Sequence, residues 1–247
     1  MPTLAQIWRH PIKGIGAEDL GEVTLSPGRP MPFDRAFAVL TGTSEDTGEW
    51  QPCRNFARGC YAPSLMAVRA ETNGEKITLT HPDRDPLIFA PATGDASALI
   101  DWITPLYPAD RPAPRALAVA PDTGMADDPD AGVSVASLAS LRALSDAVGQ
   151  PLDPRRFRIN IWLDGDLAPF EELSWAGNAI RIGDVTLRVG ERIQRCRATE
   201  ANPDTGRRDV DTLQALRGHW GHTDFGVLAS IETGGTITVG TPIEVSA

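Results

Sequence analysis

The chain has 247 residues, of which 41% are hydrophobic and 23% charged, a composition typical of a folded globular protein with a substantial core. A formal net charge of -10 and a pI near 4.9 exclude the broad basic surface that binding to nucleic acid or to an anionic membrane requires. The N-terminal stretch MPTLAQIWRHPIKGIG lacks the apolar core of a signal peptide, and no run approaches the roughly 18 apolar residues of a spanning helix, so we expect a cytoplasmic location.

Short apolar segments separated by glycine and proline occupy the first ninety or so residues. Apolar residues alternate with polar or small ones at Val23 and Leu25 and again at Phe37 and Val39, which predicts strands. Asn73-Gly74 favours a tight hairpin between LMAVRA and KITLT. We expect this part of the chain to form an antiparallel β subdomain.

A stretch rich in proline, alanine, aspartate and glycine follows, from Pro91 to about Pro129, and is the candidate junction between two halves. It is expected to contain a short helix near residues 99–103 and one buried strand at RALAVA. The next segment, VSVASLASLRALSDAVGQ, predicts the clearest helix of the chain. Apolar residues recur at spacings of three and four, at Leu138, Leu141, Leu144 and Val148, with serine at the entrance and Gly149 at the exit.

The segment FRINIWL alternates strictly and predicts a strand. One face would carry Phe157, Ile159, Ile161 and Leu163, and the other face Arg158, Asn160 and Trp162. Arg158 and Asn160 are therefore expected side by side, pointing out of the core.

More strand is predicted in NAIRIGDVTLRVGERIQRC, with a turn at Gly183-Asp184, and this strand leads directly to Cys196. A short helix is expected from about Thr212 to Arg217, capped by Asp209 or Asp211. The last segment, FGVLASIETGGTITVGTPIEV, predicts a closing hairpin that turns at Gly234-Gly235.

Cys196 lies in basic surroundings, because four arginines and one glutamate fall between residues 188 and 198 of an otherwise acidic chain. Nearby cations stabilise a thiolate and lower the pKa of a cysteine. Such a thiol suits a nucleophile, a persulfide carrier or a ligand to a soft metal. The sequence alone leaves these three alternatives open.

The other cysteines and the histidines give weaker signals. Three cysteines are too few for a disulfide framework, and Cys53 and Cys60 lie outside the usual zinc spacings, so both are expected to be reduced and inert. The four histidines also lack zinc-site spacing and are expected to be structural or exposed; they are His10, His81, His219 and His222.

Several segments in order resemble a MOSC protein, a family named for the C-terminal part of molybdenum cofactor sulfurase. They are HPIKG, DRAFAVL, VSVASLASL, RRFRINI, RCRATEANPDTGRRD and FGVLASIETGGTITVGTPIEV. The resemblance implies a mainly β fold with a few helices, of the α+β class. An N-terminal β-barrel-like subdomain, residues 1–92, would pack against a MOSC β-barrel domain, residues 93–247.

The resemblance also implies a molybdenum cofactor, in which a molybdopterin dithiolene holds the metal. Cys196 matches the cysteine that binds molybdenum and would be the catalytic metal ligand. Contacts to the pterin and its phosphate are implied for Lys13, Arg35, Arg158, Asn160 and Arg195. A thiolate is a soft donor suited to this metal, and arginine forks suit a phosphate, so residue chemistry and resemblance agree.

By resemblance, the expected activity is two-electron reduction of N-hydroxylated small molecules, as in the mitochondrial amidoxime-reducing component. Gly14 and Gln194 stand where these relatives have serines, which leaves the substrate open. The alternatives are a persulfide sulfur-transfer protein acting through Cys196 and a non-catalytic cofactor carrier. The length leaves no room for the desulfurase region of the sulfurase, and no cysteine cluster follows Cys196, so electrons are expected from a separate flavoprotein, ferredoxin or cytochrome.

Overall fold

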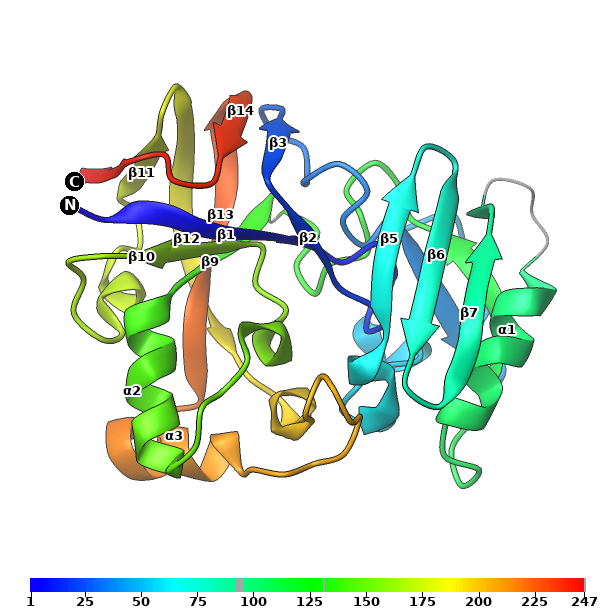
Figure 1. The fold of residues 1–247 in the computed structure, drawn as a ribbon. Helices are drawn as coiled ribbons and strands as arrows, with labels where there is room; N and C mark the ends of the chain where they lie inside the picture. The colour runs from blue at the N-terminus through cyan, green and yellow to red at the C-terminus, as the bar shows by residue number, and fades with distance from the viewer. Residues whose placement is uncertain (92–95, 131, 247) are drawn as a thin grey trace.

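The structure, a computed structural model, describes residues 1–91, 96–130 and 132–246. Figure 1 shows two lobes that are joined by the strand β1 and the segments around it. Strands predominate over helices in the described residues, so the mainly β class expected from the sequence is confirmed. None of the described helices is long and apolar enough to cross a membrane.

One lobe is built on an eight-stranded sheet with the order β15-β11-β12-β13-β9-β10-β1-β2. The first strand β1 pairs antiparallel with β10, so the N-terminus of the chain contributes to the sheet of the C-terminal half. The strands of this sheet are β1 (Thr3–Arg9), β2 (Glu18–Leu20), β9 (Val133–Ser137), β10 (Ile161–Asp164), β11 (Ala179–Ile182), β12 (Val185–Gln194), β13 (Asp224–Thr233) and β15 (Ile243–Ser246).

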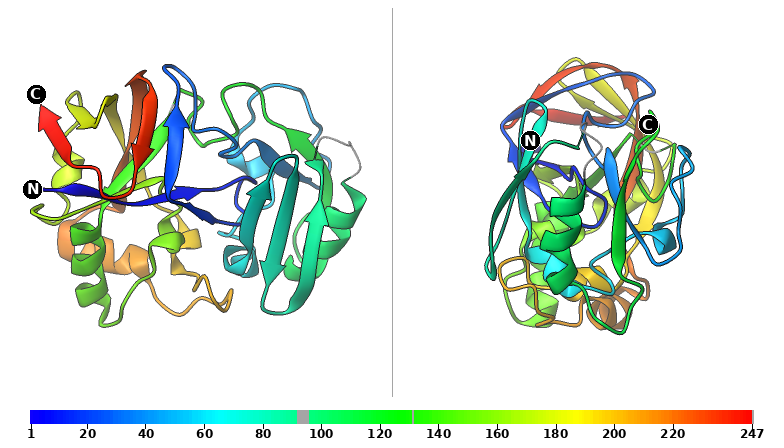
Figure 2. Two further views of the ribbon diagram at one scale, coloured as in Figure 1. Left: turned by 45° about the horizontal axis from the view of Figure 1, so that its top comes forward. Right: turned by 90° about the vertical axis from the view of Figure 1, so that its right-hand side faces the viewer.

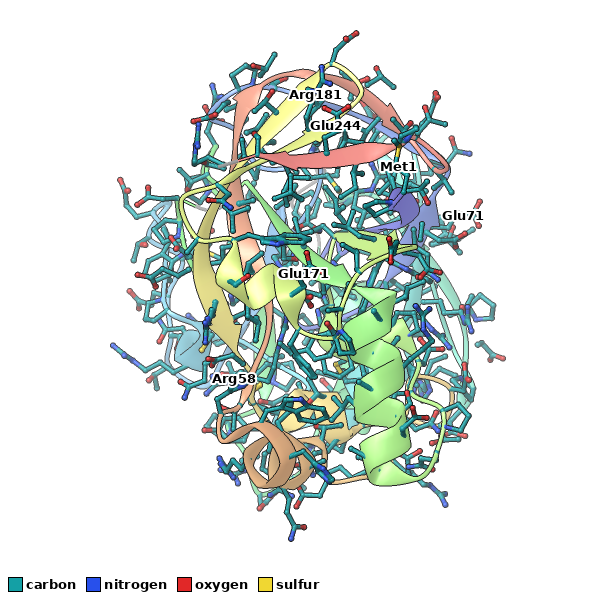
Figure 3. The ribbon with its side chains drawn as sticks, turned by 90° about the vertical axis from the view of Figure 1, so that its left-hand side faces the viewer. Met1, Arg58, Glu71, Glu171, Arg181 and Glu244 are labelled. Carbon is teal, nitrogen blue, oxygen red and sulfur yellow. The ribbon has the colours of Figure 1, made fainter. Side chains whose placement is uncertain are left out.

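The two termini meet at the outer side of this lobe, on the left of Figure 1. An isolated bridge joins Thr3 to Pro242, and β15 pairs with β11. Arg181 and Glu244, both labelled in Figure 3, form a 2.5 Å ion pair across β11 and β15. Because both side chains are exposed, this pair adds little to stability.

The second lobe contains a three-stranded sheet, a two-stranded sheet and one helix, and it stands on the right in Figure 1 and in the left-hand view of Figure 2. Asn73 pairs with Lys76 in the first hairpin, which confirms the turn predicted at Asn73-Gly74. Its elements are β4 (Phe37–Thr41), β5 (Arg69–Asn73), β6 (Lys76–His81), β7 (Arg84–Phe89), β8 (Pro114–Val119) and α1 (Ser97–Ile103).

Strand pairing crosses between the two halves of the sequence. The N-terminal strands β1 and β2 pair within the sheet of the C-terminal half, while β8 pairs with β4 and α1 contacts β7 and β8. Among the described residues the strand orders are open, so neither lobe is a hydrogen-bonded closed barrel. The division of the chain at residue 92 stays a prediction.

The two longest helices have the ends that the sequence predicts. In α2 (Leu138–Val148) the Ser137 side chain accepts a hydrogen bond from the N–H of Ser140, and Gly149 ends the helix in the left-handed region at φ 73°. In α3 (Thr212–Trp220) the Asp211 carboxylate accepts from the N–H of Gln214 at 2.8 Å. Short 3-10 helices complete the described fold: η1 (Cys53–Asn55), η2 (Pro63–Ala67), η4 (Thr104–Leu106), η5 (Pro154–Phe157), η6 (Glu171–Ser174) and η7 (Arg197–Glu200).

The strand predicted for FRINIWL is wrong in its first half. Residues 154–157 form η5, because Asp153 caps a turn that begins at a proline, and β10 starts only at Ile161. Arg158 has a left-handed backbone with φ 50°. Trp162 is fully buried rather than exposed, because helices α2 and α3 cover that face of the sheet with an apolar cluster that includes Leu144, Leu216 and Phe225.

The predicted C-terminal hairpin is also wrong. Strand β14 (Gly235–Thr238) pairs with β3 (Glu22–Leu25), while β13 pairs with β12 and β9. Ile237 joins Val23 and Leu25 in the main apolar core. Burial of these side chains favours the distant partner over a local turn at the two glycines.

Candidate functional site

A cavity of about 570 Å³ is lined by residues from both halves of the sequence. The end of β12, the residues after η5 and loops of the N-terminal half contribute its walls. All of the site residues predicted from the sequence line this cavity: Lys13, Arg35, Arg158, Asn160, Arg195 and Cys196. The fold thus brings together six side chains that are as far as 183 positions apart, while their individual roles stay predictions.

Cys196 follows the long strand β12 directly, and its side chain is exposed in the cavity wall. The pKa of its thiol is lowered to about 6, first because the thiol of Cys60 donates a hydrogen bond to its sulfur. The N–H of Ala198 and the charge of Arg195 act in the same direction, against the effect of burial. At neutral pH the sulfur is therefore mainly a thiolate, the form that binds metals or attacks electrophiles.

The structure places Cys53 and Cys60, which the sequence predicts to be inert thiols, in the wall of the cavity. Both are half-buried and line the same cavity as Cys196. The sulfur of Cys53 accepts a 2.7 Å hydrogen bond from Nη1 of Arg58, a residue labelled in Figure 3. The hydrogen bond to Cys196 and burial raise the pKa of Cys60, so this thiol keeps its proton and acts as the donor.

We expect Cys60→Ala to raise the pKa of Cys196 in the metal-free protein, because the largest cause of the lowered pKa is removed. Alkylation requires the thiolate, so its rate rises with pH through about 6 in the natural protein and through a value nearer 8.5 in the variant. The thiolate fraction at pH 7 then falls by about thirtyfold, and labelling slows accordingly. Cys60→Ser retains a donor and is the matched control. Iodoacetamide labelling rates across pH test this, and equal midpoints for natural protein and Cys60→Ala contradict it.

Lys13 presents a buried ammonium group to the cavity. Its Nζ donates to the carbonyl of Met125 at 2.8 Å and to the carboxylate of Asp127 at 2.6 Å. Burial lowers the pKa of Lys13, and Asp127 opposes this effect. Because the Asp127 side chain is 84% exposed, it is an anion that reaches the ammonium from the solvent side and that another anion can replace.

Arg35 lies near Lys13 and connects the N-terminal half of the sequence to the C-terminal half. Its Nη1 donates to the buried carboxylate of Asp34, and its Nη2 donates to the backbone carbonyl of Arg158 at 3.0 Å. His10 lies in the same buried region, where burial lowers its pKa to about 3 and keeps the ring neutral. The structural role expected for His10 is consistent with this placement.

Arg158 and Arg195 lie in the cavity wall and donate hydrogen bonds to uncharged backbone carbonyls. Arg158 donates to the carbonyls of Gly16, at 2.7 Å, and Ile12, at 3.1 Å. Arg195 donates to the carbonyls of Phe157, at 2.7 Å, and Phe225. Each guanidinium carries five N–H donors, so donors and an unneutralised positive charge remain for an anion.

The side-chain amide of Asn160 is also engaged in hydrogen bonds within the protein. Its Oδ1 accepts from the N–H and the hydroxyl of Ser134, at 3.0 and 2.8 Å, and its Nδ2 donates to the carbonyl of Trp8 at 3.1 Å. It thus connects three neighbouring segments below the cavity. The side chain is buried, so the expectation that Asn160 points out of the core is wrong.

The structure gives a physical reason for Gly14 at a position where the resemblance implies a serine. Its φ is +72°, and a Cβ at this position would lie 2.8 Å from the carbonyl oxygen of Ala57 and 2.9 Å from Cα of Arg58. These are backbone atoms, which cannot rotate away. A serine therefore does not fit here without movement of the 57–58 segment.

We expect Gly14→Ser to lower the free energy of unfolding by more than the about 1–2 kcal/mol that a left-handed backbone alone costs. Gly28→Ser is the matched control, because Gly28 has φ +65° and open space where its Cβ would stand. Urea unfolding of both variants measures the difference. Equal losses in the two variants mean that the contact with residues 57–58 has no cost.

Three further residues considered in the sequence analysis, His219, His222 and Asp209, do not line the cavity. Asp209 does not cap α3 but forms a 2.8 Å ion pair with the buried Arg156. Among the described residues no group of three or more histidine, cysteine or acidic side chains is placed to hold a metal ion.

Two family models match the chain. The MOSC domain matches residues 122–244, and the MOSC N-terminal beta barrel domain matches residues 1–100. The chain therefore belongs to the MOSC family, with the N-terminal beta barrel domain preceding the MOSC domain. No protein with a curated description matches the sequence.

Several solved structures are similar to the chain at low identity. The YuaD protein from Bacillus subtilis is 13% identical with a TM-score of 0.49, over 100% of this chain and 97% of that one. YiiM from Geobacillus stearothermophilus is 17% identical with a TM-score of 0.36, over 47% of this chain and 55% of that one. YiiM from Escherichia coli is 18% identical with a TM-score of 0.36, over 49% and 57%. Similarity at this level carries no information on activity.

Proposed function

We propose that this MOSC protein binds a molybdenum cofactor through Cys196 and reduces N-hydroxylated small molecules. The observation that carries the proposal is the exposed Cys196 thiol, with a pKa of about 6, in a cavity whose lining includes the cationic side chains of Lys13, Arg35, Arg158 and Arg195. Family membership supports it, because the MOSC family includes molybdenum-dependent reductases of N–O compounds.

The residues of the cavity fit such a cofactor. A thiolate is a soft ligand suited to molybdenum, and its exposure leaves room for ligands that the protein does not supply. Lys13 already pairs with a carboxylate, and Arg35, Arg158 and Arg195 stand near enough to influence one another's charge. These cations would hold the phosphate of the pterin.

When bound, the cofactor supplies a redox-active metal that can take oxygen from an N–O bond. The protein's own residues then have three tasks. Cys196 would hold the metal at the cavity wall, and the partly buried Arg35, Arg158 and Arg195 would hold the pterin and its phosphate. The hydrogen bond from the Cys60 thiol keeps the sulfur of Cys196 ionised and ready to bind the metal.

The electrons would come from a separate protein such as a flavoprotein, a ferredoxin or a cytochrome. The sequence has no Gly-rich dinucleotide fingerprint after a strand. The proposal therefore expects no turnover with NADH alone. A strong artificial reductant is expected to replace the partner.

The test uses protein purified from a host that makes the cofactor. Molybdenum and the fluorescent oxidation product of the pterin are measured first, and turnover of an amidoxime with reduced viologen second. Both are expected in the natural protein. Bound cofactor without turnover of several N-hydroxylated compounds favours a non-catalytic carrier, and absence of the cofactor rejects the proposal.

Sulfur transfer is the second candidate, because an exposed thiol of lowered pKa next to another thiol also suits a persulfide carrier. Metal-free protein that is loaded with labelled sulfur on Cys196 and passes it to an acceptor supports this candidate. The same experiment with Cys196→Ala is the control.

A further inference from the structure

Cys60 and Cys196 lie together in the wall of one cavity, although 136 positions separate them in the sequence. The thiol of Cys60 donates a hydrogen bond to the sulfur of Cys196, and both side chains line the same cavity. Neither is fully buried, since Cys196 is exposed and Cys60 is half-buried. A small solute in the cavity can therefore reach the pair.

The two backbone segments that carry these cysteines are held against each other. Arg208 donates to the carbonyl of Cys60 at 2.6 Å and forms a 3.3 Å ion pair with Glu200 of η7, the helix that starts just after Cys196. A Cβ placed at Gly59 would lie 3.5 Å from Cβ of Ala198. The fold therefore holds the two cysteine segments together at several points, so the placement of the two thiols does not depend on one flexible loop.

The third cysteine is engaged differently. The sulfur of Cys53 accepts its hydrogen bond from Nη1 of Arg58, at 2.7 Å. Arg58 also stacks over the ring of Tyr61, with 4.6 Å between its guanidinium carbon and the ring centroid. Cys53 is therefore a natural internal control, because it shares the cavity but its sulfur has a cationic partner.

We propose that Cys60 and Cys196 form a reversible intramolecular disulfide, which makes the pair a redox-active dithiol site within the cavity. The oxidant is a low-molecular-weight disulfide of the glutathione type, and a dithiol reverses the reaction. The proposal rests on the shared cavity wall of the two cysteines, on the close approach of Gly59 and Ala198, and on the ties that Arg208 makes to both backbone segments.

The reaction proceeds by two exchange steps. The Cys196 thiolate attacks one sulfur of the oxidant, forming a mixed disulfide and releasing one small thiolate, which takes the proton of Cys60. The Cys60 thiolate then attacks the sulfur of Cys196, and the second small thiolate leaves. In total two protein sulfurs lose two electrons, and one small disulfide becomes one thiol and one thiolate.

The disulfide also has a consequence for cofactor binding, which rests on the proposed function. The sulfur of Cys196 cannot bond to Cys60 and serve as the molybdenum ligand at the same time. While Cys196 is linked to Cys60, its sulfur is no longer a thiolate and cannot hold molybdenum. Oxidation would then withdraw the metal ligand, and reduction would restore it. Cys60 would act as the resolving cysteine of this site.

The experiment uses metal-free protein, fully reduced and then exposed to oxidised glutathione. Remaining thiols are blocked with N-ethylmaleimide, and intact masses and peptides are analysed with and without dithiothreitol. We expect the natural protein and Cys53→Ser to lose two blockable thiols without keeping glutathione, and to yield a peptide pair that joins Cys60 to Cys196. Cys60→Ser is expected to keep glutathione on Cys196.

A glutathione adduct on Cys196 that is as stable in the natural protein as in Cys60→Ser overturns the proposal. A crosslink that joins Cys53 to either cysteine also overturns it. Neither result depends on bound metal, so the failure of this proposal is separate from the failure of the proposed function, which the molybdenum content of the reduced protein decides. Circular dichroism of each variant verifies that it is folded.

Discussion

We expect Cys196→Ala, purified from a host that makes the cofactor, to contain at least about tenfold less molybdenum than the natural protein, because loss of even an outer-shell partner of a metal site costs 10–100-fold in affinity. The variant should remain folded, since Cys196 is exposed and its side chain fills no core position. Molybdenum per protein by elemental mass spectrometry and the thermal midpoint measure the two effects. Turnover with reduced viologen should disappear together with the metal.

Cys53→Ala is the matched control, because it removes another sulfur from the same cavity. It should keep its molybdenum. Equal molybdenum in Cys196→Ala and the natural protein rejects Cys196 as the ligand and leaves sulfur transfer as the better candidate.

Local signals in the sequence predicted the elements whose determinants lie within a few residues. The helix α2 has both its caps and its apolar stripe inside residues 137–149, and the hairpin at Asn73-Gly74 has its turn between adjacent strands. Each is specified by neighbours along the chain. Such elements form wherever the rest of the fold permits, so a sequence pattern is sufficient to find them.

Pairing between distant segments could not be predicted in the same way. Strand β1 pairs with β10, and β14 pairs with β3, across more than a hundred residues in each case. Alternation shows that a strand has one apolar face, but not which strand lies beside it. The turn glycines at 234–235 favour a hairpin, and only the burial of Ile237 in the distant core outweighs them.

The candidate site shows the same difference between local signals, which the sequence reveals, and contacts between distant segments, which it does not. Cys196 was found from residue chemistry and from the resemblance to the MOSC family, and the resemblance also pointed to Lys13, Arg35, Arg158 and Arg195, whereas Arg58, Arg156 and Arg192 of the cavity lining were missed as site residues. Cys60 was missed, because its importance arises from contact with Cys196 rather than from its own spacing. The arginine two positions before Cys60 was a usable signal, since arginines also accompany Cys196.

Arg158→Ala is expected to lower both stability and the amount of bound pterin. The guanidinium ties the segment before β10 to the loop that carries Lys13, through the carbonyls of Ile12 and Gly16. Each buried carbonyl left without its donor costs about 1–3 kcal/mol, and the phosphate of the pterin loses a charge-assisted contact of about 1.5–3 kcal/mol. Urea unfolding and the pterin-to-protein ratio of the folded fraction measure the two effects.

Arg155→Ala separates these two effects, because Arg155 lies in η5 just before Arg158 but does not line the cavity. Its buried guanidinium pairs with Asp153 and Asp204, at 2.6 and 2.8 Å, so its loss also destabilises the fold. If Arg158 holds the phosphate, the folded fraction of Arg158→Ala loses pterin while that of Arg155→Ala keeps it. Equal ratios in the two variants mean that Arg158 acts on the cofactor only through stability, and the phosphate then depends on Lys13, Arg35 and Arg195.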